Sequence, residues 1–208
     1  MTRDRSVAVA VGRPMHINLA HSDVEMVCEE DFVDENGYCA DPFLVKFYIQ
    51  YAKLCEIMGV VLSKNYPASP KAIQQRDSSA LLHCESLLAD WLENCPEELK
   101  FKTGDYEFWT AYLNCVYYTV TCLLHRAHLP LPSKTSIFLS KNPAFHAANM
   151  ITSIMEGLDA HNELRCTPPF MYVVDLSTPL TEVLIRPQDI FSSLCTIDVH
   201  LSATCYCA

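Results

Sequence analysis

The stretch from residue 108 to residue 129 is the most apolar part of the sequence, and it constrains the fold more than any other feature. Residues 108–124 carry no charged side chain. Their apolar side chains recur at spacings of three and four, the period of an α-helix, and cover nearly every face. A helix that is apolar all round needs neighbours on all sides, so the sequence predicts a central buried helix over about 105–128.

A membrane span is the alternative for so apolar a stretch. A spanning helix needs roughly twenty consecutive apolar residues. The run is shorter than that and is interrupted by Asn114, Thr119 and Thr121. We therefore interpret it as the core helix of a bundle and expect no membrane partner.

The residues beside this stretch predict how the central helix begins and ends. Thr103 and Asp105 are candidate N-caps, and His125, Arg126 and His128 suit the negative C-terminal end of the helix dipole. The two histidines stand three apart without the spacing of a metal motif. We interpret them as surface residues.

Three other stretches have the apolar stripe of amphipathic helices. The first begins with Asp41 as N-cap and Pro42 at the first helical position, the second ends at Pro96, and the third begins at Asn142 and Pro143. Their inward positions are Phe47, Tyr51, Leu54, Met58 and Val61; Leu81, Cys84, Leu88, Trp91 and Cys95; and Ala147, Ile151, Ile154 and Leu158.

Two shorter features complete the predicted fold. Residues 4–11 alternate like a strand, but Gly12 and Pro14 follow as they would after a helix, so we interpret this segment as a helix tail. Gly59 predicts close packing. The expected fold class is all-α, an irregular multi-helix bundle around the central helix. Its predicted core contains Tyr51, Leu88, Trp91, Trp109, Tyr117, Leu124 and Ile154.

The sequence changes character near its C-terminus. Residues 171–208 are short β-branched segments separated by prolines, and nothing there continues the helical pattern. We expect residues 1–170 to form one helical domain and residues 171–208 to form a divergent tail, either disordered or β-like.

Eleven cysteines raise the question of disulfides or zinc. There is no C-x-x-C, and the pair at Cys205 and Cys207 is too isolated for a credible zinc site. The N-terminus lacks the pattern of a signal peptide, which favours a reducing compartment. Five cysteines fall on apolar helix faces, where we expect them to be small buried hydrophobes: Cys55, Cys84, Cys95, Cys115 and Cys122.

Acidic residues outnumber basic ones by 25 to 15, and no basic run occurs, so the chain is not expected to grip a phosphate backbone by itself. The carboxylates of residues 29–35 leave one enzymatic alternative, a helical Mg²⁺-dependent enzyme. We interpret the segment as a solvated acidic loop instead. The sequence contains none of the familiar catalytic or nucleotide-binding motifs. No catalytic or metal residue is assigned, no enzyme activity is expected, and cofactor-binding residues stay unknown.

Five segments in order resemble successive parts of a known domain. They are GRPMHINLAHSDVE at 12–25, YIQYAKLCEIMGVVLSKNY at 48–66, LLADWLENCPEELKF at 87–101, YLNCVYYTVTCLLHRAHL at 112–129 and AFHAANMITSIMEGL at 144–158. Together they resemble the fungal-specific transcription factor domain. This is the middle homology region of fungal zinc-cluster transcription factors, here of the cutinase transcription factor type.

The resemblance implies transcription regulation in the nucleus, by a helical regulatory or effector-sensing domain. Partners would be proteins, as a homodimer or as co-regulators, and a small-molecule effector. The family binds DNA and zinc through an N-terminal cysteine cluster that residues 1–170 do not match, so we expect no cofactor in this chain. We expect the domain to be truncated at both ends and the tail at 171–208 to come from an altered gene model. A non-functional truncated product is the alternative.

Overall fold

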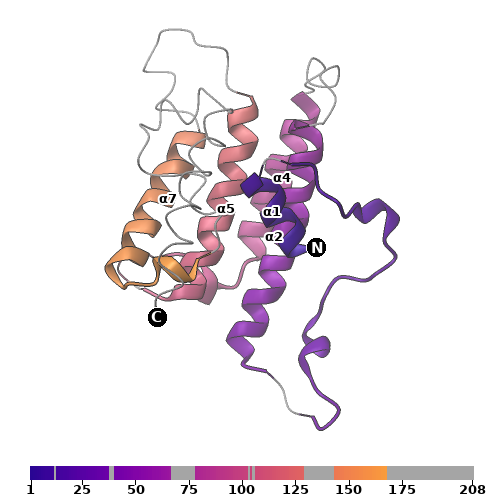
Figure 1. The fold of residues 1–208 in the computed structure, drawn as a ribbon, viewed down its shortest axis with the longest axis vertical. Helices are drawn as coiled ribbons and strands as arrows, with labels where there is room; N and C mark the ends of the chain where they lie inside the picture. The colour runs from indigo at the N-terminus through magenta and orange to yellow at the C-terminus, as the bar shows by residue number, and fades with distance from the viewer. Residues whose placement is uncertain are drawn as a thin grey trace, which may run out of the picture.

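The computed structural model describes residues 1–11, 13–37, 40–66, 78–102, 104, 106–128 and 143–167, and over these ranges every regular element is a helix (Figure 1). The predicted all-α bundle is therefore confirmed. The tail predicted at 171–208 lies outside the described residues. The elements are α1 (Thr2–Val11), η1 (Leu19–His21), η2 (Glu29–Phe32), α2 (Pro42–Asn65), α4 (Ser78–Asn94), η3 (Glu97–Leu99), α5 (Phe108–Ala127), α7 (Pro143–Ala160) and η4 (Leu164–Cys166).

Helix α5 is the centre of the bundle, as predicted, with α7 on one side and α2 on the other (Figure 1). It begins one residue after Glu107, whose carboxylate accepts the backbone N–H of Thr110 at 2.6 Å. Glu107 is thus the N-cap. The candidate caps Thr103 and Asp105 lie outside the described residues.

Small side chains let α7 approach α5 closely. Ala144 and Ala147 have no exposed surface, and Ala148 has 1%. Behind them the larger Ile154 and Leu158 are buried in the main core. The predicted inward face of α7 is confirmed, and it packs against α5 more extensively than any other element does.

Helix α2 begins where its sequence predicts, and α4 packs on it through its predicted stripe. Asp41 accepts the N–H of Phe43 at 2.9 Å, with Pro42 as the first helical residue. On α4, Trp91 is buried, and its indole Nε1 donates to the carbonyl oxygen of Gln50 at 3.2 Å. This hydrogen bond joins α4 to α2 within the core.

Close packing at Gly59 is confirmed, and the reason is a buried arginine. A Cβ at Gly59 would lie 2.7 Å from Nε of Arg5, a residue of α1 that is 2% exposed. The Arg5 guanidinium donates to the Asp4 carboxylate and, at 2.8 Å, to the carbonyl oxygen of Ile17. This burial could not be predicted from the sequence, because α1 has the pattern of a short helix with a polar start.

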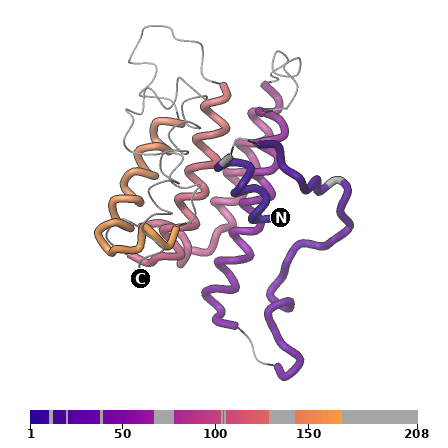
Figure 2. The backbone as a smooth tube through the Cα atoms, in the orientation of Figure 1, coloured from indigo at the N-terminus to yellow at the C-terminus, as the bar shows by residue number. Residues whose placement is uncertain are grey.

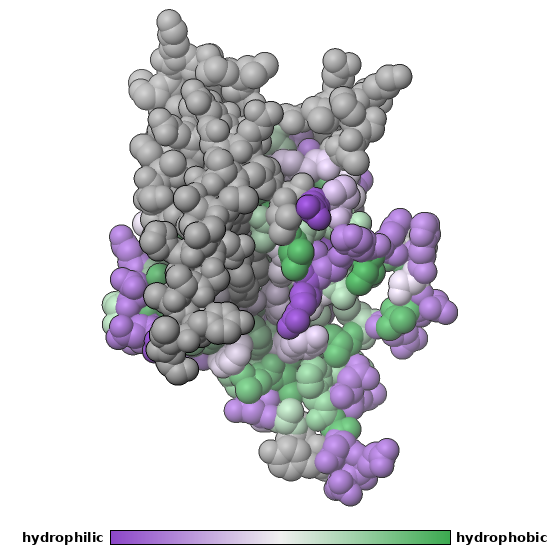
Figure 3. Space-filling view, in the orientation of Figure 1, coloured by the Kyte–Doolittle hydropathy of each residue, from purple (hydrophilic) through white to green (hydrophobic). Residues whose placement is uncertain are grey.

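The segment after α1 runs along the outside of the bundle and packs on α2 at η2, where the Phe32 ring lies 5.7 Å from the Tyr48 ring between centroids. In the backbone trace, residues 13–37 form a long excursion beside the helices, and the space-filling view shows it as largely hydrophilic with isolated apolar side chains (Figures 2 and 3). Val24 is 82% exposed there. Glu29, Glu30 and Asp31 together with Phe32 form the short helix η2, which has no buried residue.

The predicted core is partly confirmed. Four of its members are buried: Leu88, Trp91, Leu124 and Ile154. Tyr51 and Tyr117 are partly buried and pack on the core cluster. Trp109 is 37% exposed, so the prediction for it was wrong. It lies in the first turn of α5, on the side of a pocket.

The interpretation of His125 and His128 as surface residues was wrong for His125. Its side chain is 12% exposed, and its Nδ1 lies 3.7 Å from the Glu85 carboxylate of α4. Helix α4 covers this side of α5. The sequence alone does not predict which face of α5 the neighbouring helix covers. His128 is partly buried, and its Nε2 lies 2.7 Å from Oδ1 of Asn65.

Candidate ligand pocket

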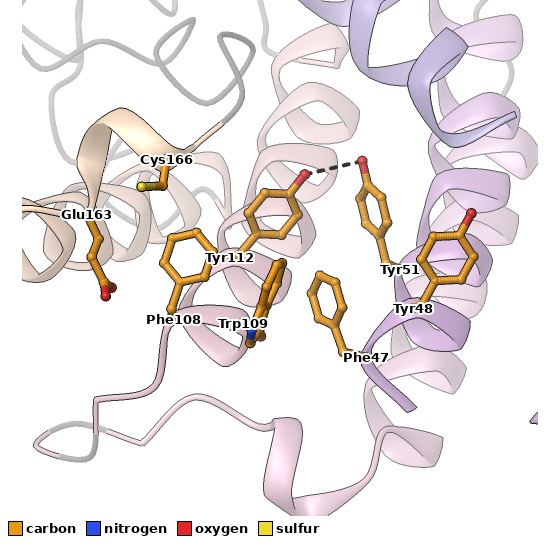
Figure 4. A pocket seen from close by; sticks show the side chains of 8 residues that line it. All are labelled: Phe47, Tyr48, Tyr51, Phe108, Trp109, Tyr112, Glu163 and Cys166. Atoms are coloured by element: carbon orange, nitrogen blue, oxygen red, sulfur yellow. Dashed lines mark hydrogen bonds between the residues drawn. The ribbon is translucent and has the colours of Figure 1, made fainter. Parts of the chain in front are cut away.

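An open pocket of about 670 Å³ lies between the start of α2, the start of α5 and the turn at η4 (Figure 4). Its lining is mainly aromatic. Helix α2 supplies three aromatic residues, α5 supplies three more, and the chain after α7 adds a carboxylate and a thiol. In chain order these are Phe47, Tyr48, Tyr51, Phe108, Trp109, Tyr112, Glu163 and Cys166.

The two helices bring their rings together by the same spacing. In each helix the aromatic residues stand at positions i, i+1 and i+4, which places the first and last on one face. Phe47 lies 4.9 Å from the Trp109 ring and 5.7 Å from the Tyr112 ring, measured between centroids. These separations are within the range of favourable aromatic pairs, so the wall is a packed cluster.

Two tyrosine hydroxyls meet at the deep side of the pocket. The Tyr112 hydroxyl donates to the Tyr51 hydroxyl at 3.4 Å, and the Tyr51 hydroxyl lies 3.1 Å from Oγ of Ser6 on α1 (Figure 4). Burial raises the pKa of both phenols above the ordinary value. Both side chains are therefore neutral near pH 7.

The carboxylate of Glu163 is held at the other end of the pocket. The hydroxyl of Tyr106 donates to Oε2 of Glu163, and the Tyr106 ring stacks on His161 with a centroid distance of 3.7 Å. Burial, together with the hydrogen bond to Glu163 and its charge, raises the Tyr106 pKa. A turn with Asn162 in the left-handed region, at φ 59°, leads into this position. The carboxylate thus has a fixed location.

The sequence prediction left cofactor-binding residues unknown, and it missed this pocket. The repeated i, i+1, i+4 aromatic spacing in residues 47–51 and 108–112 was the available signal. The apolar stripe of each helix, which is the basis of the prediction, does not separate a core ring from a pocket ring. Glu163 could not be found in this way, because its place depends on the turn after α7.

The five cysteines predicted to be small buried hydrophobes can be checked in the structure. The five cysteines expected in the core are buried. Burial raises the pKa of Cys55 and of Cys115 to about 12. A thiol in such surroundings stays protonated and is a poor nucleophile.

The acidic segment 29–35 does not assemble into a metal centre in the part of the chain that the structure describes. No group of three or more His, Cys, Asp or Glu side chains is close enough there to hold an ion. Asp31 instead accepts the backbone N–H of Cys28 at 2.9 Å, which is a local turn contact. The magnesium alternative therefore gains no support from the geometry. No helix of the described ranges is long and apolar enough to cross a membrane.

Comparison with known proteins shows where the chain belongs. It is 49% identical over 180 residues to cutinase transcription factor 1 alpha of Fusarium vanettenii. That alignment covers 82% of this chain and 20% of the Fusarium protein. The chain is 30% identical over 165 residues to the acetamidase regulatory protein of Emericella nidulans, covering 78% of this chain and 20% of the relative. The chain is a homologue of one region of these fungal transcription factors. The predicted resemblance is confirmed.

The chain thus spans about a fifth of the length of each of these relatives. No family model matches it, and no solved structure matches it. The alignments are long enough to include most of the helical bundle, so the homology concerns the domain described above and not a short motif.

Proposed function

We propose that this chain is part of the helical regulatory region of a fungal transcription regulator, and that it acts by binding in the nucleus without catalysis. The observation that carries the proposal is the 49% identity over 180 residues to a fungal transcription factor. So high an identity over most of the chain supports a shared role for this region in the two proteins.

The described geometry supports a binding role. The pocket between α2 and α5 has aromatic walls and one carboxylate, which suits retention of a ligand through apolar contact. The buried thiols have a raised pKa, which makes them unreactive. In this proposal the partners are a small-molecule effector and other proteins, either co-regulators or a second copy of the chain.

DNA contact would come from the zinc cluster of the parent family and not from these helices. The formal charge of the chain is −10, and basic residues are too few and scattered to neutralise a row of phosphates. The transcriptional effect in this proposal is therefore transmitted through protein contacts.

The test is a chimera. The region of the Fusarium factor that aligns with this chain is replaced by the full 208-residue chain, and transcription of a reporter is measured in a fungal host. We expect the chimera to keep regulated transcription, and we expect Ile154→Asp, which places a charge in the core, to abolish it. A deletion of the same region with unchanged reporter regulation would contradict the proposal, because the region would then have no regulatory role.

A further inference from the structure

The pocket joins two chemically different parts, an aromatic wall and a carboxylate at one end (Figure 4). We propose that it binds a small organic cation, an ammonium group carried by an apolar body. The ammonium group lies near Glu163, and the apolar body lies along Phe108, Trp109 and Phe47. This rests on the proposed ligand-binding role of the pocket and names the chemical class of the ligand, and its test measures binding alone, so it can fail while the proposed role in transcription stands.

The charges at the pocket select the sign of the ligand. Among the lining residues that the structure describes, Glu163 is the one carboxyl, and none is Lys, Arg or His. The tyrosine hydroxyls are neutral near pH 7, since burial raises the pKa of Tyr51 and Tyr112. An anionic ligand would meet repulsion from Glu163 with no compensating cation, whereas an ammonium ion gains an ion pair.

The aromatic rings add a second preference for a cation. The faces of Trp, Tyr and Phe carry negative electrostatic potential, and an ammonium group within about 6 Å of a ring centroid is attracted to it. Trp109 is 37% exposed and Tyr48 is 42% exposed, so ring surface is accessible to a ligand. The volume of about 670 Å³ suits a small molecule.

The carboxylate is placed to receive the ammonium group. The Tyr106 hydroxyl donates a hydrogen bond to Oε2 of Glu163, and the stacking of the Tyr106 ring on His161 restrains both side chains. A carboxylate accepts several hydrogen bonds, so Oε1 has capacity for an N–H donor of the ligand. A pre-placed acceptor lowers the entropy lost on binding.

Three probes of equal length test the sign of the preferred charge. They are 4-phenylbutylamine, 4-phenylbutan-1-ol and 4-phenylbutanoate, which present a cation, a neutral hydroxyl and an anion on the same apolar body. Isothermal titration of the full chain at pH 7 is expected to give the tightest binding for the amine, at least about tenfold tighter than for the carboxylate. Binding of the carboxylate as tight as the amine, or no binding of the amine, would overturn the proposal.

The substitution Glu163→Gln tests whether the charge of Glu163 contributes to binding of the amine. It removes the charge but keeps an acceptor for Tyr106, and we expect it to weaken amine binding about fivefold and to leave the alcohol unchanged. The matched control is Glu156→Gln, on the exposed side of α7, which alters net charge equally. Equal affinities for the amine in the two variants would contradict the role of Glu163.

Two exposed cysteines locate the bound probe without a substitution. Cys166 lines the pocket, whereas Cys28 directly precedes η2 and is not among the described lining residues, and both are exposed free thiols. The rate of alkylation of each thiol is measured by peptide mass spectrometry, with and without 4-phenylbutylamine. We expect the rate at Cys166 to fall and the rate at Cys28 to stay constant. Amine binding that leaves Cys166 as reactive as before would place the probe elsewhere and overturn the assignment.

Discussion

The two sides of α5 close in different ways. Towards α7 the contact is made by Ala144, Ala147 and Ala148, and the interface has essentially no exposed surface. Towards the start of α2 the contact is made by Phe47 and Tyr112 with their aromatic neighbours, and a pocket of about 670 Å³ stays open. Helices with small side chains approach until the backbones meet, whereas rings hold them apart.

This difference separates stability from binding within one helix. The closed side excludes water and is tightly packed, so substitutions there should destabilise the fold strongly. The open side has rings whose faces are still accessible, so truncation should cost less stability and more binding. If the division holds, truncating a buried side chain on the closed side lowers stability more than truncating a ring on the open side.

Ile154→Ala, on the closed side, should destabilise the fold by about 3 kcal/mol, because a buried isoleucine leaves a cavity when it is truncated. Trp109→Ala, on the open side, should cost only about 1 kcal/mol despite the larger deletion, since the ring is partly hydrated already. Urea unfolding followed by circular dichroism measures both. A Trp109→Ala cost as large as that of Ile154→Ala would remove the distinction.

Ala147→Leu should destabilise the fold by about 2 kcal/mol. Ala147 has no exposed surface against α5, so the added atoms force the helices apart or into strained rotamers. The same substitution at Ala160, exposed at the end of α7, should change stability by less than about 0.5 kcal/mol. If Ala147→Leu were as mild as Ala160→Leu, the α5–α7 interface would have room that the structure does not show.

The closed side was the part that the sequence predicted well. The spacing of Ala147, Ile151 and Ile154 specifies an inward face, and a charge-free helix at 108–124 needs partners wherever it is placed. Asp41 with Pro42 gives the start of α2 by local chemistry alone. These signals depend on neighbours within about one helical turn.

The open side could not be predicted in the same way. A ring at an inward position is core or pocket wall depending on what covers it, and that cover comes from residues far away in sequence. Trp109 illustrates the failure, since its spacing matches the core while 37% of it is exposed. The environments of Arg5 and Glu163 could not be predicted for the same reason. Their environments are made by Gly59 and by Tyr106, which no local pattern connects to them.

A third contact, between α1 and α2, tests whether small residues admit close approach in general. Gly59→Ala should destabilise the wild-type chain by about 1 kcal/mol, because the Cβ would displace the buried Arg5 guanidinium. In an Arg5→Ala background the same change should stabilise the chain by about 1 kcal/mol, as Ala is the better helix former. A double-mutant cycle measures this reversal. The same sign in both backgrounds would contradict the direct contact.

The smallest expected effect is a pH dependence at the C-terminal end of α5, where α4 covers the helix. Burial lowers the pKa of His125 from the ordinary value of 6.5; Glu85 opposes the shift and His128 adds to it. The unfolded chain therefore takes up this proton at a higher pH than the folded chain, so the contribution of neutral His125 is fully present above pH 6.5 and is lost as the pH falls below that value. We expect the free energy of unfolding to drop between pH 7.5 and pH 5.5 by less in His125→Gln than in the wild type. His83→Gln, at an exposed position of α4, is the matched control and should keep the wild-type slope. An identical slope in all three proteins would show that His125 is as hydrated as the sequence first suggested, and that α4 does not close over this end of the central helix.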